Sequence, residues 1–116
     1  MSNTLKPSEI LFQAAEEYQK QGVSRGHLYN PDNGKCCILG TIAKVALGNP
    51  ERVYALEYGE VGAPGPVAVT ALRDEVGYNI PAWNDHARTR DGRLLSARSI
   101  AGKVRKAARR LQGWGL

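Results

Sequence analysis

The sequence lacks any long hydrophobic run and is poor in aromatic residues, methionine and cysteine. Aromatic residues make up 7% of its 116 residues, and there are two Cys, two His and one Met. A membrane-spanning helix needs roughly 18 apolar residues, and no run approaches this length. No signal-peptide pattern precedes the first charges. Adjacent cysteines provide no disulfide framework, and two Cys with two His have no metal-ligand spacing. We therefore expect a cytoplasmic protein with no membrane partner, metal or cofactor.

The overall composition favours one globular domain over residues 1–116. Hydrophobic residues account for 42% of the chain and charged residues for 23%, which is ordinary for a soluble protein. A chain of this length can bury about two-thirds of its unfolded surface without the support of a metal or a disulfide. We expect flexible ends at about 1–6 and 113–116. The patterns specify no oligomeric state.

Hydrophobic periodicity predicts a mainly α fold, with about five helices packed around a central helix at about 37–47. This central segment is the most apolar part of the chain, and only Lys44 is charged within it. The other helices are expected at Pro7–Gln21, 49–58, 67–76 and from Ser99 to about Leu111. Residues 78–80 precede a proline and are expected to be extended, with a turn or short helix at 82–86.

A turn signal precedes the central helix. The cluster Asn30-Pro-Asp-Asn-Gly34 tolerates positive φ, so residues 27–29 and 35–37 are expected to pair as one small β-hairpin at about 27–37. Gly40 lies inside the central helix, where glycine costs about 1 kcal/mol relative to alanine. We interpret this cost as the sign of a close approach by another backbone segment.

Cys37 is the candidate nucleophile, because a helix N-terminus stabilises a thiolate and lowers its pKa. His86 and Asp85, with His27 and Asn84 as further candidates, would complete a Cys–His–Asn/Asp constellation. The spacing is not specific to catalysis. A free cysteine more often serves as a small buried hydrophobic residue, and we favour that role. No catalytic set is firm, and we expect a protein that is not an enzyme.

The Trp83-Asn84-Asp85 motif has two interpretations. An indole, an amide and a carboxylate together can hold a polar ligand. Alternatively, Trp83 fills the core while Asn84 or Asp85 bonds backbone N–H groups of a neighbouring turn. We favour the structural interpretation, and we assign Cys37 and Gly40 to the same structural framework.

Positive charge is concentrated at the C-terminal end. Residues 88–116 contain nine Lys/Arg and one acid, a net charge of +8, whereas residues 1–87 have a net charge of −3. Such asymmetry indicates an acidic or polyanionic partner. On a helical wheel, six cations of the last helix lie opposite its apolar stripe, and Trp114 follows as a possible anchor. The candidate binding residues are Arg98, Lys103, Arg105, Lys106, Arg109, Arg110 and Trp114. A merely solvated face is an equally weighted alternative.

Two stretches resemble a small family of uncharacterised proteins from actinobacteria and their phages. Cys37-Ile-Leu-Gly40-Thr-Ile42 is similar to the family pattern Cys-x-Leu-Gly-Ala-Ile, and Trp83-Asn84-Asp85 matches its Trp-Asn-Asp. The chain departs from the family at Cys36, at Thr41 and in a longer connection over 86–98. The resemblance implies a helix ending in glycine before a hairpin, a final helix after Trp-Asn-Asp, and a phage or actinobacterial origin. It implies no reaction.

These patterns rank three functions. The first is a small phage-encoded accessory protein that acts in the host cytoplasm by non-enzymatic binding to a host protein. The second is nucleic-acid binding, in which the basic C-terminal helix contacts the phosphate backbone. The third is a cysteine-dependent hydrolase or transferase.

Overall fold

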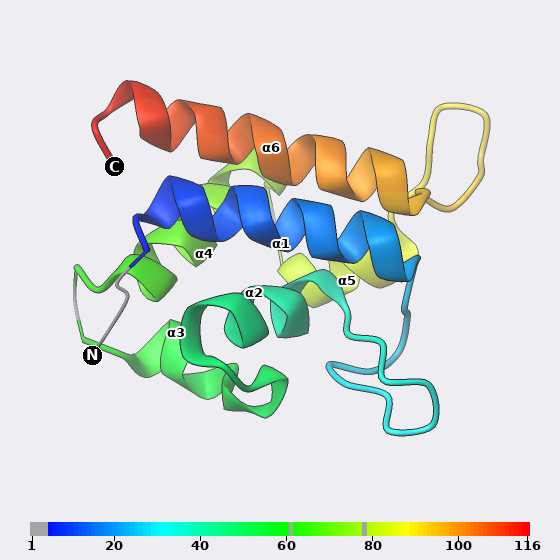
Figure 1. The fold of residues 1–116 in the computed structure, drawn as a ribbon. Helices are drawn as coiled ribbons and strands as arrows, with labels where there is room; N and C mark the ends of the chain where they lie inside the picture. The colour runs from blue at the N-terminus through cyan, green and yellow to red at the C-terminus, as the bar shows by residue number, and fades with distance from the viewer. Residues whose placement is uncertain (1–4, 61, 78) are drawn as a thin grey trace.

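A computed structural model of the protein describes residues 5–60, 62–77 and 79–116 (Figure 1). These residues form six α-helices and one short 3-10 helix, which confirms the mainly α class. The elements in chain order are α1 (Pro7–Gln21), α2 (Ile38–Leu47), η1 (Pro50–Arg52), α3 (Tyr54–Tyr58), α4 (Pro64–Val76), α5 (Ile80–His86) and α6 (Ala97–Gly113). Most of the N-terminal segment expected to be flexible, residues 1–4, lies outside the described ranges.

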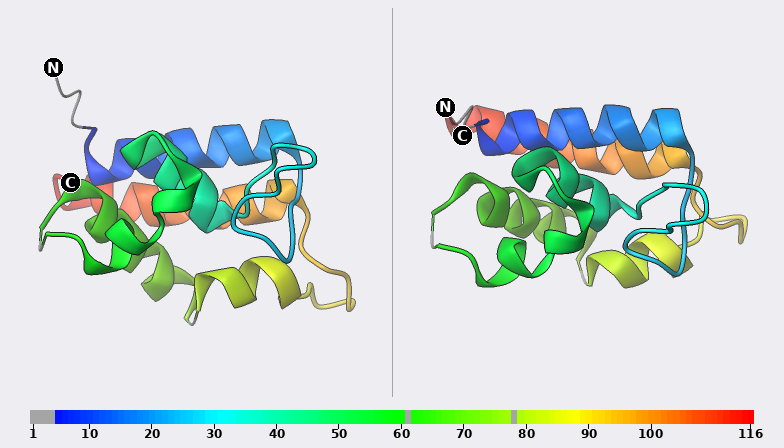
Figure 2. Two further views of the ribbon diagram at one scale, coloured as in Figure 1. Left: turned by 90° about the horizontal axis from the view of Figure 1, so that it is seen from below. Right: turned by 60° about the horizontal axis from the view of Figure 1, so that its bottom comes forward.

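Helices α1 and α6 form a long antiparallel pair (Figures 1 and 2). Helix α1 also contacts α2 and α4, so its buried side has neighbours on several helices. Both members of the pair bury alanines, among them Ala14, Ala15, Ala101 and Ala108, and these small side chains allow close packing. Residues 38–43 of α2 are buried, whereas its last turn is partly exposed. The core is therefore organised around α1 as well as α2.

The predicted β-hairpin over residues 27–37 is wrong. Within the described residues, one isolated antiparallel bridge joins Tyr29 to Cys36, and no strand forms. The tight turn itself is present, because Gly34 has a φ of +73° and its N–H donates to the Asn30 carbonyl at 2.8 Å. Pairing stops after Cys37 because Ile38 is already the first residue of α2.

The predicted extended stretch at residues 78–80 is also incorrect at Ile80, which begins α5. Tyr78 lies outside the described ranges. Asn79 is the N-cap of α5, and its Oδ1 accepts a hydrogen bond from the Ala82 N–H at 3.0 Å. Pro81 lies in the first helical turn, where its missing N–H leaves no helical hydrogen bond unmade. Of the two forms expected at 82–86, a turn or a short helix, the helix is the one present, as part of α5.

The remaining element boundaries differ from the expectations by a few residues. The single helix expected at 49–58 divides into η1 and α3, and Tyr54 is exposed. Helix α6 begins at Ala97 because Ser96 is its N-cap, with Oγ accepting from the Ser99 N–H at 3.1 Å. At the other end of the chain, the Leu116 carbonyl accepts from the Ser8 hydroxyl at 3.2 Å, so residues 113–116 turn back onto α1.

Candidate binding surface

The environment of Gly40 confirms the close backbone approach predicted from the sequence. A Cβ atom added at Gly40 would lie 2.1 Å from the Leu28 carbonyl oxygen, which is closer than non-bonded atoms can approach. The same carbonyl accepts a hydrogen bond from the Cys37 N–H at 3.2 Å. Gly40 therefore allows the loop before α2 to lie directly against the first turn of that helix.

Cys37 is buried at the start of α2, where its side chain is the N-cap. Its exposed fraction is 2%, and its Sγ accepts from the Gly40 N–H at 3.5 Å. Burial raises the pKa of the Cys37 thiol. The amide hydrogen bonds from Gly40 and Leu39 oppose this effect but do not reverse it, and the nearby Asp85 carboxylate raises the pKa further. This environment favours the neutral thiol over the nucleophilic thiolate.

The two histidines are not placed to activate Cys37. His27 and His86 are both exposed, and no hydrogen bond joins either imidazole to Cys37 within residues 5–60, 62–77 and 79–116. Asp85 does lie near the thiol, but as a carboxylate that disfavours its ionisation. The fold thus brings together Cys37, Asn84 and Asp85 and leaves the imidazoles outside.

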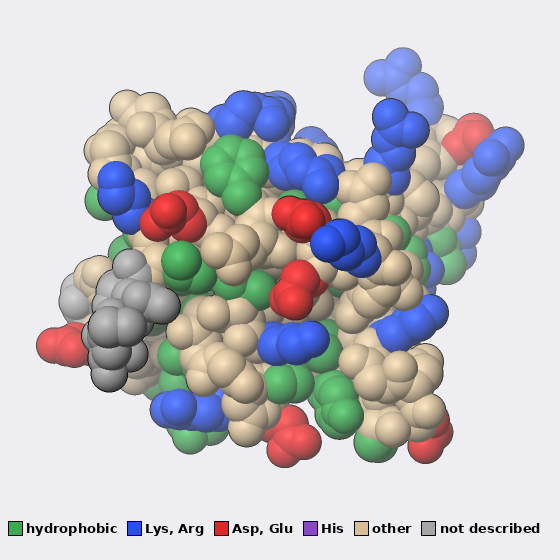
Figure 3. All heavy atoms as spheres, in the orientation of Figure 1, with side chains coloured by type: hydrophobic (Ala, Val, Ile, Leu, Met, Phe, Trp, Pro, Cys, Tyr) green, Lys and Arg blue, Asp and Glu red, His purple; other side chains and the backbone are tan. Residues whose placement is uncertain are grey.

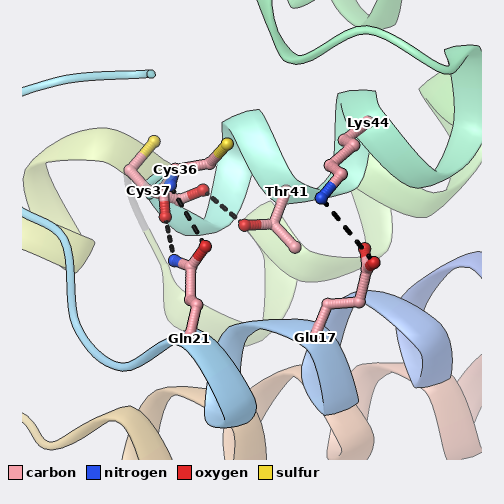
Figure 4. A network of polar contacts seen from close by, with 6 residues as sticks. All are labelled: Glu17, Gln21, Cys36, Cys37, Thr41 and Lys44. Atoms are coloured by element: carbon pink, nitrogen blue, oxygen red, sulfur yellow. Dashed lines mark hydrogen bonds and ion pairs between the residues drawn. The ribbon is translucent and has the colours of Figure 1, made fainter. Parts of the chain in front are cut away.

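Cys36 is held by the last residue of α1 (Figure 4). Its N–H donates to Gln21 Oε1 at 3.2 Å, and the Gln21 amide donates back to its carbonyl oxygen. The side chain of Gln21 thus occupies the place of a neighbouring strand. In the same region, the Thr41 hydroxyl donates to the Cys37 carbonyl at 2.9 Å. Both cysteines therefore lie in a fixed junction between α1 and α2.

Asn84 is the centre of a buried hydrogen-bond network, and its exposed fraction is 1%. Its Oδ1 accepts from the Tyr18 hydroxyl at 2.9 Å and from the Ile38 N–H at 3.0 Å. Its Nδ2 donates to the Ser24 carbonyl at 2.8 Å and to the Asp85 carboxylate at 2.9 Å. One amide therefore joins α1, the following loop, α2 and α5. These contacts leave Asn84 no capacity to hold a ligand, which supports its structural interpretation.

The cations of α6 divide into two edges. One edge faces α4, where three side chains surround the carboxylate of Glu75. Arg110 Nη2 lies 2.8 Å from Oε1, while the Lys106 and Lys103 ammonium groups lie 3.5 Å and 3.9 Å from Oε2. The other edge consists of Arg98, Arg105 and Arg109, which differ from the first set by roughly 60–160° on a helical wheel of 100° per residue.

Glu75 is the residue of this surface that no sequence pattern had indicated. Its side chain is only 5% exposed. Its Oε1 forms an ion pair with Arg110 but accepts no hydrogen bond within the described residues. The signal was available in the spacing. Glu75 follows the buried residues Ala68 and Leu72 at seven and three positions, so it lies on the inner side of α4.

A cavity of about 500 Å³ lies where the C-terminal end of α6 meets α4 and the loop after α3. Its lining is mostly apolar, and Trp114 lies in it with 79% of its surface exposed. The cavity thus joins two candidate residues from the sequence, Arg110 and Trp114, to residues that no pattern had indicated. The lining residues are Glu57, Gly59, Gly62, Pro66, Val67, Thr70, Ala71, Asp74, Arg110, Leu111, Trp114 and Leu116.

The fold and this surface define a small helical domain with a cavity beside a basic helix. Residues 2–110 match the sequence pattern of a family described as a family of unknown function (DUF6197), and the chain belongs to that family. No curated protein and no solved structure matches the chain. In the described part of the chain, no helix is both long and apolar enough to cross a membrane.

Proposed function

We propose that this protein is a non-enzymatic binding protein that engages a partner protein through the cavity at the end of α6. The observation that carries the proposal is a largely apolar cavity of about 500 Å³ with an exposed tryptophan in its wall. The occupant is an apolar side chain of the partner, carried on a segment with acidic residues beside it.

The aromatic and basic residues around the cavity support a protein partner. Tryptophan, tyrosine and arginine are the residues that most often dominate the binding energy of protein interfaces. Trp114 and Arg110 line the cavity, and Tyr58 lies between the lining residues Glu57 and Gly59 with 84% of its surface exposed. These side chains would surround an inserted apolar group and exclude water from it.

The charge beside the cavity supports an acidic segment. Three cations, Lys103, Lys106 and Arg110, share the single carboxylate of Glu75. Two acids, Asp74 and Glu57, also line the cavity, and Glu57 is paired with Arg73, so positive charge in this region still exceeds negative charge by one. An acidic partner would balance this excess and would be attracted from a distance.

The partner is a host protein in this proposal. The resemblance to actinobacterial and phage proteins motivates an accessory protein that acts in the host cytoplasm. The interior position and raised pKa of Cys37 support a function without covalent chemistry. Iodoacetamide treatment followed by mass spectrometry tests this part. We expect both cysteines to remain unmodified in the folded protein at mild alkaline pH and to react after unfolding, whereas rapid modification of Cys37 in the folded protein would favour a nucleophile.

The direct experiment compares three variants for capture of proteins from an actinobacterial lysate. W114A removes the exposed anchor, A71E places a charge in the cavity, and L94A removes an exposed hydrophobic residue that lies outside the cavity lining. A captured protein is then purified, and its affinity is measured by titration calorimetry. We expect W114A and A71E to weaken binding at least tenfold and L94A to change it less than twofold.

Intrinsic fluorescence gives a second readout of the same contact. The chain has two tryptophans, and Trp83 is buried whereas Trp114 is exposed. Insertion of a partner next to Trp114 should shift the emission to shorter wavelength in the wild type and not in W114A. If no protein binds in a manner that depends on Trp114, or if L94A weakens binding equally, the cavity is not the partner site.

A further inference from the structure

We propose that Arg98, Arg105 and Arg109 form a phosphate-binding edge on α6 that holds the backbone of duplex DNA. This site is separate from the cavity and goes beyond the protein-binding function. The three residues lie on the edge of α6 that does not face Glu75. Arg98 and Arg109 are exposed and Arg105 is half-buried.

The first support is the absence of an internal partner for these three guanidinium groups. In residues 5–60, 62–77 and 79–116, which include all eleven Asp and Glu of the chain, no carboxylate forms an ion pair with Arg98, Arg105 or Arg109. On the opposite edge of the same helix, Lys103, Lys106 and Arg110 share the one carboxylate of Glu75, which offsets part of their charge. The cations of α6 without a carboxylate partner in the described chain therefore lie on one side of the helix.

The second support is spacing. The three arginines fall within about 40° of one another on the helical wheel, so they form a row along α6. At a rise of 1.5 Å per residue, they are separated by about 10 Å and about 6 Å along the helix axis. Phosphates of one DNA strand repeat about every 3.4 Å along the duplex axis, so these intervals correspond to roughly three and two phosphates.

The third support is the chemistry of the edge. A stable protein interface has an apolar centre, but the exposed large hydrophobic residues found in the described chain include none between Arg98 and Arg109. All three residues are arginine, and the planar guanidinium group binds phosphate with two parallel hydrogen bonds. A row of arginines without an apolar centre is suited to a phosphate backbone and provides no means of reading base sequence.

The loop before α6 extends the positive region. Arg88, Arg90 and Arg93 are exposed there, and Arg93 is paired with Asp91 at 3.2 Å. Figure 3 shows several Lys and Arg side chains along the top of the molecule, over α6 and the adjoining loop, with one acidic side chain at the loop and both charge types mixed lower on the same face. A duplex lying along α6 would thus meet further positive charge beyond the three arginines.

The test is fluorescence anisotropy with a labelled 20-base-pair DNA duplex of random sequence at increasing salt. Three neutralised phosphates predict a slope of log affinity against log salt of about −3, since each contact contributes about −0.9. The variant R98Q/R105Q/R109Q should bind at least tenfold more weakly and lose most of this slope. Circular dichroism confirms that the variant is folded, as expected for three side chains without internal ion pairs.

The matched control is K35Q/K44Q/R52Q, which removes the same charge from α2 and the residues flanking it, and not from α6 or from its neighbour α1. It should change the affinity less than twofold, whereas an equal loss in both triple variants would show a non-specific charge effect and overturn the proposal. An absence of binding at 20 mM salt would also overturn it, as would binding to anionic lipid vesicles without binding to the duplex. W114A should bind DNA normally, so failure of the cavity proposal and failure of this one are distinguishable.

Discussion

Gly40 shows how one backbone position determines the path of the chain into α2. G40A would place a methyl group against the Leu28 carbonyl oxygen, at 2.1 Å before any adjustment. Because the obstacle is backbone, relief requires the loop to move, and overpacking of this kind costs about 1–3 kcal/mol. We expect urea unfolding to show a loss of about 2–3 kcal/mol in the free energy of unfolding.

The matched control is Gly102, which lies within α6 and has open space where its Cβ would be. An alanine at position 102 would meet no steric obstacle, and its helix propensity is better than that of glycine. G102A should therefore stabilise the protein by about 0.5–1 kcal/mol. If G40A lowers the free energy of unfolding and G102A raises it, glycine is required at position 40 by the close approach of Leu28 and not tolerated there merely as a helix residue. A stabilising G40A would contradict the close approach.

Asn84 can be tested through the groups that it satisfies. N84A leaves the Ile38 N–H, the Tyr18 hydroxyl and the Ser24 carbonyl without this partner in a buried region. Each unsatisfied buried group costs about 1–3 kcal/mol, although rearrangement recovers part of the loss. We expect a destabilisation of about 3 kcal/mol by thermal or chemical unfolding. N79A removes only the N-cap of α5 and should cost about 1 kcal/mol; equal losses would show that Asn84 is no more than a local cap.

At the scale of the elements, local sequence signals predicted the helices well but wrongly predicted that two β-strands pair before α2. The bounds of α1 and α2 follow from Pro7, from the apolar periodicity and from the glycines that end each helix. The hairpin failed because the chain enters α2 directly after Cys37 and because Gln21, fifteen residues away, occupies the outward backbone groups of Cys36. A side chain that substitutes for a strand has no signature in the local sequence.

The contact between α4 and α6 depends on the carboxylate of Glu75. E75Q retains the shape of the side chain but removes the charge that holds Lys103, Lys106 and Arg110. These cations are about half exposed and can turn to solvent, so the loss is smaller than for a fully buried ion pair. We expect E75Q to lower the free energy of unfolding by about 1–2 kcal/mol at low salt.

Two comparisons check this contact. E57Q breaks an exposed pair with Arg73 and should cost about 0.5 kcal/mol or less. Because salt screens charges, the difference between wild type and E75Q should shrink as sodium chloride is raised to 1 M. A difference that is unchanged by salt would show that packing around Glu75, and not its charge, stabilises the contact.

At the scale of the whole molecule, the sequence indicated where positive charge lies but not which of the cations form ion pairs within the fold. The wheel correctly grouped six cations on α6. Only the packing of α4 against α6 separates them into a set engaged by Glu75 and a row of three free arginines among the described residues. The cavity could not be predicted from the sequence for the same reason, since its lining comes from residues 57 to 116 on three helices and a loop. Both features arise where elements meet, and the periodicity of a single element carries no sign of them.

Alkaline pH provides a test of the interior as a whole. Burial raises the pKa values of the Cys37 and Cys36 thiols above 9.0 and that of the Tyr18 hydroxyl above 10.0. These groups therefore release protons more readily in the unfolded chain than in the folded protein. The stability that their neutral forms contribute is fully present below the unfolded pKa values, and it is lost as pH rises from those values through the folded ones.

The expected result is a free energy of unfolding that these groups leave unchanged from pH 6 to about 8 and that falls from about pH 9 to 10. Each group contributes at most about 1.4 kcal/mol per pH unit within its window. Urea unfolding in a series of buffers measures the decline. The buffers should stay below pH 10, where most lysines remain charged. C37S keeps an N-cap at α2 but removes one titrating thiol, so its decline should be less steep than that of the wild type. If the wild type shows no decline up to pH 10, or if C37S declines equally, Cys37 ionises in the folded protein as it does in the unfolded chain, and its place in the interior does not protect the neutral thiol.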